Sequence, residues 1–305
     1  MVNNIHIIDT KMFGFDQYCA AYLVEGEKIA LIDTGMPSQI EAVRSGLQAH
    51  RFSIKDVSYI FVTHCEHLDH SGNVGTFLRE NPRANVYIHP AGLEYLTKPE
   101  IDKVKLKERI PLVMAERFGE MEAVQHSRIK CLNNGDVFDL GNGEKLRIIF
   151  APGHQPSGIV IFEEKNKGLF INDLVGNCLV DADVHYPLNP FRSDHQQGIK
   201  SLKKLMNLPV KFLYLGHYGI SDRPKQIMAR AIETLQQLID IGIKYMGEGK
   251  PELIASEIWK MMMPELEKLR LARGEAVYEY ATSEHLPSQI QFFTKYCQER
   301  FCTNK

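Results

Sequence analysis

The stretch that most constrains this chain is VTHCEHLDHSGN, residues 62–73. It places six ligand-type side chains within seven positions: His64, Cys65, Glu66, His67, Asp69 and His70. Imidazoles and carboxylates packed this densely into one turn would repel one another without a cation, so the stretch predicts a metal site. The preceding VSYIFVTH is a short continuous apolar run, which is typical of a buried strand. The fold therefore has to place a metal-binding turn directly after a buried strand.

Three more candidate ligands follow apolar runs in the same way. His154 lies in APGHQPSG, Asp173 in FINDLVG and His217 in YLGHYG. Loops at strand ends are common positions for catalytic groups. Mixed imidazole and carboxylate ligands suit zinc, iron or manganese, and more than four of them indicate two ions. Asp173 is the natural bridging carboxylate, and a water between two cations would lose a proton near neutral pH and act as nucleophile.

The pattern of apolar residues divides the 305-residue chain into two parts. Strand-like and helix-like runs alternate up to about residue 222, interrupted by a charged, helix-periodic insertion at about 91–127. Residues 223–305 carry a helical apolar stripe, with Pro264 and Pro287 expected to separate helices. We therefore predict an α/β domain over 1–222 and a helical C-terminal extension over 223–305 that caps the active site.

Composition argues against several classes of partner. The formal net charge is −2, and no basic block is present, so we expect neither nucleic-acid nor membrane binding. No apolar stretch has the length of a membrane span, and the first ten residues lack the pattern of a signal peptide. Six cysteines without a CxxC pair are typical of reduced thiols. These features predict a cytoplasmic protein.

Taken in order, these motifs resemble the signature of the metallo-β-lactamase superfamily, T-H-x-H-x-D-H-x-G followed by a lone histidine, a bridging aspartate and a final histidine. The matching residues are Thr63, His64, Asp69, His70, Gly72, His154, Asp173 and His217, and LIDTG at 31–35 matches a further element in which the aspartate is structural. The resemblance covers roughly residues 18–220. It implies a four-layer αββα sandwich with the metals at one edge, and the helical extension resembles that of a branch with helices over the active site.

The signature of this chain is one residue longer than usual between His64 and His70. Deleting Glu66 would give the usual hydrolase form, whereas deleting His67 would give a form that looks like the flavo-diiron branch. Asn172, where hydrolases commonly have glycine, also looks like that branch. Extra carboxylate ligands favour iron or manganese, and histidine favours zinc.

The family mapping implies the ligands of each metal. One metal would take His64, His154 and either Glu66 or His67, with His67 slightly preferred and both together remaining open. The second would take Asp69, His70 and His217, and Asp173 would bridge the two. Asp69 is also the catalytic candidate, because it can steer the bridging water or accept its proton. Cys65 is expected to point into the core.

We therefore predict a dinuclear metal-dependent hydrolase that uses a metal-bridging hydroxide on a small ester, thioester or lactone. Its cofactors would be two divalent ions, zinc first, with iron or manganese as the alternative. Two other functions stay open: a non-haem di-iron protein that binds or reduces dioxygen, and a non-enzymatic metal-containing signalling or binding protein. The expected partner is a small-molecule substrate, and the helical extension could form a homodimer.

Overall fold

The computed structural model describes residues 4–99, 116–186 and 193–301. The chain divides into two compact units. The first unit comprises the residues up to Phe150 together with Ser157–Asn172 and Val210–Asp222, and the second comprises Ala151–Pro156, Asp173–Pro209 and the residues from Arg223 onward. Each unit is described by itself.

The first unit contains two six-stranded sheets. One sheet has the order β1-β2-β3-β4-β5-β6, with the bounds Ile5–Asp9, Ala20–Val24, Ile29–Ile32, Val57–Phe61, Asn85–Ile88 and Ile129–Cys131. The other has the order β14-β13-β10-β9-β8-β7, with the bounds Ile220–Ser221, Phe212–Leu215, Gly168–Ile171, Ile159–Glu163, Glu144–Phe150 and Val137–Gly141. The predicted sandwich of two sheets is therefore confirmed.

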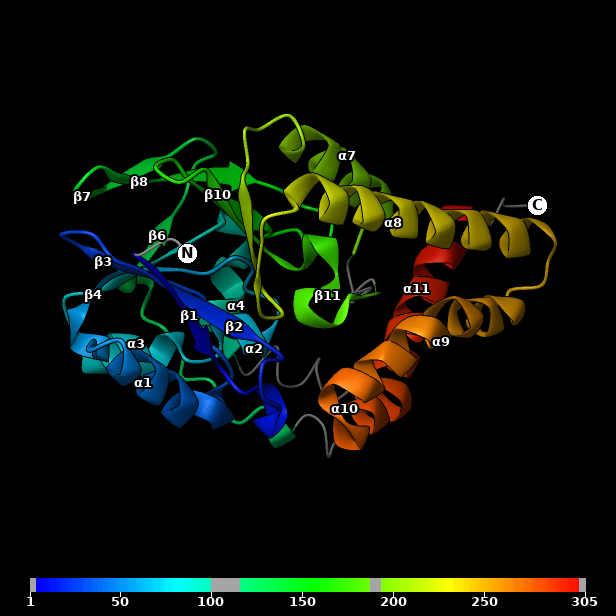
Figure 1. Ribbon diagram of the computed structural model, residues 1–305, viewed down its shortest axis with the longest axis horizontal. Helices are drawn as coiled ribbons and strands as arrows, with labels where there is room; N and C mark the ends of the chain where they lie inside the picture. Colours follow the sequence, from blue (N-terminus) through cyan, green and yellow to red (C-terminus); the bar gives the residue numbers. More distant parts are fainter. Residues whose placement is uncertain (1–3, 100–115, 187–192, 302–305) are drawn as a thin grey trace. The chain divides into compact units, whose positions relative to one another are not determined.

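Among the described residues, the first unit has the helices α1 (Ile40–Ala49), α2 (Leu68–Ser71), α3 (Val74–Glu80) and α4 (Leu93–Thr97). Helix α1 forms because apolar residues recur at a helical spacing, and Val43 and Leu47 are fully buried. These two residues share a core cluster with Leu31, Ile60 and other residues of the first sheet. Figure 1 shows α1 and α3 along one side of that sheet.

A second core cluster fills the space between the sheets. The first sheet contributes Tyr22, Ile32 and Phe61, and the second contributes Phe170 and Tyr214, all at most 3% exposed. Strands β2, β3, β9 and β10 are buried at every position, and accordingly their sequences are mostly continuous apolar runs. This cluster packs the two sheets against each other, so the strand ends of one sheet keep a fixed position relative to those of the other.

Two parallel strand pairs position the loops that carry the candidate ligands. Strands β3 and β4 are parallel and pair Ile32 with Phe61, so the residues after each strand leave the same edge of the sheet. Strands β10 and β13 are parallel and pair Ile171 with Leu215 in the same way. Because the carboxyl ends of parallel strands meet at one edge, such loops are where open α/β sheets commonly hold ligands.

The described part of the second unit contains the β11-β12 hairpin (Asn177–Leu179, Val184–Tyr186) and helices α7 (His195–Leu205), α8 (Pro224–Gly247), α9 (Leu253–Arg273), α10 (Glu275–Tyr280) and α11 (Leu286–Phe301). Glu265 on α9 accepts hydrogen bonds from the backbone N–H of His185 at 2.7 Å, from Arg230 at 2.9 Å and from Lys268 at 3.0 Å. The carboxylate of Glu265 thus connects α9 to β12 and to α8. The predicted helical region is confirmed.

One expected helix boundary is wrong. Pro264 lies inside α9 rather than between helices, whereas Pro287 lies at the start of α11 as predicted. A proline inside a helix removes one backbone hydrogen bond. The buried stripe of α9 continues on both sides of Pro264 and comprises Ile254, Ile258, Met262, Leu266 and Leu269. Tertiary packing of an apolar face contributes more to such a helix than local propensity does.

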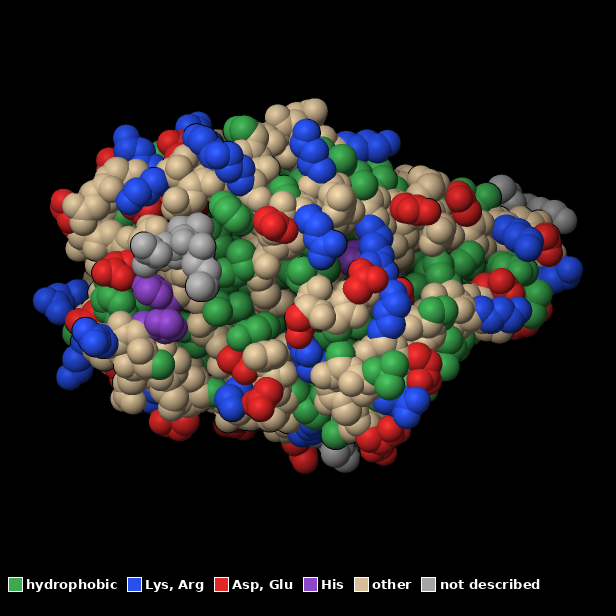
Figure 2. Space-filling view, viewed as in Figure 1, with side chains coloured by type: hydrophobic (Ala, Val, Ile, Leu, Met, Phe, Trp, Pro, Cys, Tyr) green, Lys and Arg blue, Asp and Glu red, His purple; other side chains and the backbone are tan. Residues whose placement is uncertain are grey.

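Part of the expected insertion at 91–127 falls outside the described residues, because 100–115 are not described. Within the rest, α4 and a 3-10 turn at His126–Arg128 are present, and residues 119–125 form neither helix nor strand. Among the helices that the structure describes, none combines the length and the apolar character that crossing a bilayer requires. On the face shown in Figure 2, basic and acidic side chains are interspersed.

A buried pair of carboxylates predicts how stability depends on pH. Glu144 and Glu163 are fully buried on neighbouring strands, and Lys165 approaches Glu144 to 3.9 Å. Burial, and then the charge of Glu163, raise the pKa of Glu144 from 4.5 to about 7. A carboxyl with a raised pKa binds its proton more tightly in the folded state, so the free energy of unfolding should fall as pH rises from 4.5 to about 7.

Glu144→Gln should therefore stabilise the protein at pH 8, by about 2 kcal/mol, because glutamine keeps a donor toward Glu163 without a charge. The gain should shrink at pH 5, where Glu144 is already protonated. Thermal unfolding of both proteins at the two pH values measures it, and the exposed Glu27→Gln is the matched control. An equal difference at both pH values would contradict the interpretation that burial beside Glu163 raises the pKa of Glu144.

Candidate metal centre

Asp33, at the end of β3, organises the start of the histidine-rich turn. Its carboxylate accepts hydrogen bonds from the backbone N–H and the hydroxyl of Thr63, both at 2.8 Å. It also accepts one from Nδ1 of His70 at 2.9 Å. The Thr63 hydroxyl lies 3.2 Å from Nδ1 of His64 and, since it donates to Asp33, it accepts there. One buried carboxylate thus orients two candidate ligands.

These contacts also set the tautomers of the histidines. When Nδ1–H of His70 donates to Asp33, its Nε2 is left unprotonated and able to bind a metal. Nδ1 of His217 donates in the same way to the backbone carbonyl of Tyr18 at 3.1 Å. Metal-binding histidines nearly always donate their other ring N–H to a carboxylate or carbonyl. His70 and His217 therefore have the environment that metal ligands require.

The loop that carries His154 is held by close backbone packing. Gly153 has a φ of 147°, and a Cβ there would lie 2.3 Å from the Cα of Gly198 on α7, so no other residue fits. Its carbonyl accepts a hydrogen bond from the backbone N–H of Asp194 at 2.7 Å, and the hydroxyl of Ser201 donates to Pro152 at 2.6 Å. This packing fixes the direction of His154.

Seven of the eight predicted metal ligands form two groups. The first group comprises His64, His67, His154 and Asp173, and the second comprises Asp69, His70, Asp173 and His217. Within each group, the ligand atoms lie within 4.8 Å of one another. All are buried except His67, which is partly buried. Asp173 belongs to both groups, which is the position that a bridging carboxylate would need. It directly follows Asn172, whose side-chain amide donates to the carbonyl of Ile159 at 2.9 Å.

The spacing of the ligand atoms fits metal coordination. In a tetrahedral site with bonds of 2.0–2.1 Å, neighbouring ligand atoms are about 3.4 Å apart. Nε2 of His64 lies 3.2 Å from Nδ1 of His67, and Nε2 of His154 lies 3.5 Å from Oδ2 of Asp173. Oδ2 of Asp69 lies 3.6 Å from Nε2 of His70. The donor set therefore fits two divalent cations.

Glu66 is the predicted ligand that the structure places elsewhere. Its carboxylate accepts hydrogen bonds from the backbone N–H groups of Cys65 at 3.0 Å and Ser157 at 3.1 Å, and from the Ser157 hydroxyl. It belongs to neither ligand group. The prediction that Cys65 points into the core is confirmed, because its side chain is 2% exposed within the core cluster of the first sheet, and burial raises the pKa of its thiol well above 9.

Sequence reasoning missed two contributors. Ser157 received no role, although it lies in the same APGHQPSG motif as His154, because nothing in a single sequence links it to Glu66. Asp33 was recognised only as a structural residue of LIDTG. Its φ of 62°, a left-handed conformation that aspartate and asparagine tolerate best, was not visible in the sequence.

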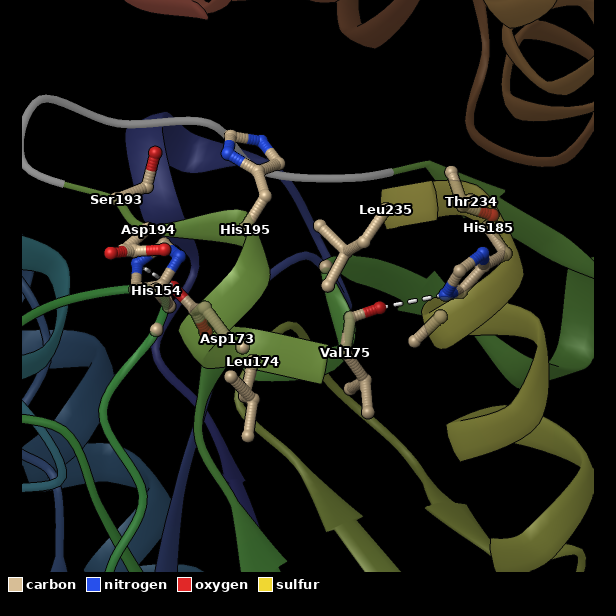
Figure 3. Close-up of a pocket in the computed structure, with 14 residues that line it drawn as sticks. His154, Asp173, Leu174, Val175, His185, Ser193, Asp194, His195, Thr234 and Leu235 are labelled. Atoms are coloured by element: carbon tan, nitrogen blue, oxygen red, sulfur yellow. Dashed lines mark hydrogen bonds and ion pairs between the residues drawn. The ribbon is translucent and has the colours of Figure 1, made fainter. Parts of the chain in front are cut away.

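A small cavity lies within the second unit beside His154 and Asp173 (Figure 3). In that view His154 and Asp173 lie on one side of Leu235, and His185 lies on the other. Its volume is about 20 Å³, which is room for about one water. Burial lowers the pKa of both His185 and His195 to about 4, so these two lining imidazoles are uncharged at neutral pH.

Asp33→Asn tests the orienting carboxylate. Asparagine keeps the shape and tolerates the left-handed backbone, but it has no charge, so we expect about 10- to 100-fold weaker metal binding. Competition with a chromophoric chelator measures the affinity. Asp136→Asn, at a position outside the site, is the control for loss of an aspartate. Unchanged affinity in Asp33→Asn would show that Asp33 only supports the fold.

Comparison with known proteins finds a matching family model and related sequences. The family model described as the Metallo-beta-lactamase superfamily matches residues 14–217. A putative diflavin flavoprotein from Nostoc sp. is 26% identical over 212 residues, which is 65% of this chain and 33% of the relative. A flavo-diiron protein from Clostridium acetobutylicum is 27% identical over 271 residues, which is 78% of this chain and 60% of the relative. The chain thus spans between a third and three-fifths of these relatives.

Among solved structures, a metallo-beta-lactamase superfamily protein from Sulfolobus tokodaii is similar with a TM-score of 0.65 and 25% identity. The match covers 78% of this chain and 87% of that protein. The structural likeness therefore extends beyond the region that the family model matches.

Proposed function

The chain belongs to the metallo-beta-lactamase superfamily, and from this membership we propose that it is a dinuclear metal-dependent hydrolase acting on a small ester, thioester or lactone. The observation that carries the proposal is the ligand set. His67 joins the first group and Glu66 does not, so five imidazoles and two carboxylates face the two metal positions. A nitrogen-rich set favours zinc, which has no redox chemistry and serves hydrolysis.

Two bound cations would polarise a substrate carbonyl and lower the pKa of a water between them. The residues of the chain supply the remaining functions. Asp173 would contribute a carboxylate oxygen to each metal position and so would hold the two positions at a fixed separation. Asp69 is 6% exposed and adjoins the second position, where its carboxylate can accept the proton that the attacking water releases. Asp33 holds His64 and His70 in the tautomers that bind metal.

The cavity beside His154 and Asp173 is too small for a substrate, but its mostly apolar lining favours an uncharged acyl group next to the metal positions. His185 donates from Nε2 to the carbonyl of Val175 at 2.7 Å and remains neutral, and Leu174, Val175 and Leu235 supply apolar surface. Of the two acidic residues of the lining, Asp173 is a candidate metal ligand and Asp194 is paired with Arg300. Arg and Lys, which would recognise a phosphate, are not among the described residues that line this cavity.

The test is reconstitution of metal-free protein with zinc or with iron, followed by a panel of esters, thioesters and lactones. We expect hydrolysis by the zinc form, with turnover proportional to zinc bound up to two equivalents. Hydrolysis that is absent with every metal, while the proteins bind two equivalents, would overturn the proposal and leave the metal site intact.

A second candidate is a non-haem di-iron protein that binds or reduces dioxygen. It is favoured by the likeness to the flavo-diiron protein of Clostridium acetobutylicum, of which this chain covers 60%. Anaerobic loading with ferrous iron followed by exposure to air tests it. A visible absorption band that forms with dioxygen, together with no hydrolysis by the zinc form, would favour this candidate over the first.

A further inference from the structure

We propose that Ser157 determines which side chain completes the first metal position: it holds Glu66 away from the site, and His67 takes the place. The inference concerns the choice of ligand and of metal. It holds whichever reaction the site performs, so its failure and that of the hydrolase proposal are distinguishable.

The carboxylate of Glu66 is already engaged in several hydrogen bonds. Three donors converge on it: the backbone N–H and the hydroxyl of Ser157, and the backbone N–H of Cys65. The Cys65 N–H also lies 3.0 Å from the Ser157 hydroxyl oxygen, so the three groups form one small network. Hydrogen bonds to a charged carboxylate are among the stronger ones in proteins, so turning Glu66 toward a metal would require breaking several of them.

Ser157 is itself held in place by the sheets. It is 1% exposed and stands two residues before the start of β9. The backbone N–H of Ile159, the first residue of β9, donates to the carbonyl of Thr63 at 2.8 Å. This bond joins the first residue of β9, two positions after Ser157, to Thr63, the residue that precedes His64. Ser157 therefore acts from a fixed position on a turn that carries one residue more than usual.

The extra residue gives the turn two candidate ligands in succession, and the network separates their roles. His67 Nδ1 lies 3.2 Å from His64 Nε2, at the spacing of two ligands on one ion, and their ring planes are inclined at 81°. Glu66 points its carboxylate at Ser157 instead. Exchanging an imidazole for a carboxylate would move the preference of the site from zinc toward iron or manganese. Ser157 is thus a positioning residue for metal selectivity.

In the experiment, metal-free protein is mixed with equimolar zinc and ferrous iron in the absence of oxygen. Elemental analysis then measures the ratio of bound zinc to bound iron. We expect Ser157→Ala to shift the ratio toward iron by roughly fivefold, because Glu66 loses its hydroxyl donor. Ser157→Thr, which keeps the hydroxyl, should retain the natural ratio. Ser157→Ala combined with Glu66→Gln should return toward it, since glutamine supplies no anionic ligand. Cobalt(II) spectra of the same proteins report the ligand change directly.

A purely structural role would give a different result. Ser157→Ala would then melt at a lower temperature with an unchanged zinc-to-iron ratio and an unchanged cobalt spectrum, which would overturn the inference. Two further variants test it even if Ser157→Ala does not fold. Glu66→Gln should keep two tightly bound metals, whereas His67→Gln should bind one of them at least tenfold more weakly. The reverse pattern would show that Glu66 is the ligand in the natural protein.

Discussion

Replacing Asp173 with asparagine is expected to lower hydrolysis about 10³-fold and to weaken the binding of both metals. The reason is its position: Asp173 alone belongs to both ligand groups, and its Oδ2 lies 3.5 Å from Nε2 of His154. Asparagine keeps the shape but cannot supply one anionic oxygen to each ion. Steady-state rates on the best substrate of the panel and elemental analysis of the same samples measure the two effects.

Asp240→Asn is the matched control, since Asp240 is exposed on α8 and its carboxylate accepts a hydrogen bond from the side-chain amide of Gln236. It should retain both rate and metal content. The metal content of Asp173→Asn is informative by itself. If two equivalents remained bound with natural affinity, the bridging role would be wrong whatever reaction the protein catalyses.

Phe61→Ala should lower the free energy of unfolding by about 4 kcal/mol. Phe61 is fully buried between the sheets, with ring centroids 4.9 Å from Phe138 and 5.4 Å from Tyr87. Alanine would leave a cavity that the neighbouring rings can fill only in part. Urea unfolding of the metal-free protein measures the change, and its coincidence by fluorescence and circular dichroism establishes whether a two-state analysis holds.

Two variants calibrate that loss. Phe61→Leu retains most of the apolar volume and should cost clearly less, about 1.5 kcal/mol. Val137→Ala, at a position 47% exposed on the edge strand β7, should change stability by less than about 0.5 kcal/mol. A loss in Phe61→Ala no larger than that of Val137→Ala would contradict the view that the inter-sheet core governs stability.

Much of the fold followed from local patterns. The two apolar runs of AAYLVEGEKIALIDTG, residues 20–35, form β2 and β3, and the predicted strand before the histidine-rich turn is β4. These segments were predictable because strands buried on both faces read as continuous apolar runs. The order of the candidate ligands was predictable for a related reason: each follows such a run, and parallel strands bring their ends to one edge.

Other features depend on partners far along the chain. The choice between Glu66 and His67 could not be made from the turn alone, because the residue that holds Glu66 is Ser157, 91 positions away. The helix through Pro264 was missed because its buried stripe outweighs a local breaker. Strand β1 at Ile5–Asp9 was not predicted either, since its place in the sheet comes from pairing with β2.

The distribution of the ligands along the chain also constrains when the protein can acquire its metals. The first ligand is His64 and the last is His217, and each group draws on segments about 90 or more residues apart. While the chain is being synthesised, the second group lacks a ligand until residue 217 has left the ribosome. An ion that binds only the finished arrangement stabilises it by mass action, without guiding the earlier steps of folding. Metal loading should therefore follow the assembly of both sheets, and metal supply should change the persistence of the folded protein rather than its rate of formation.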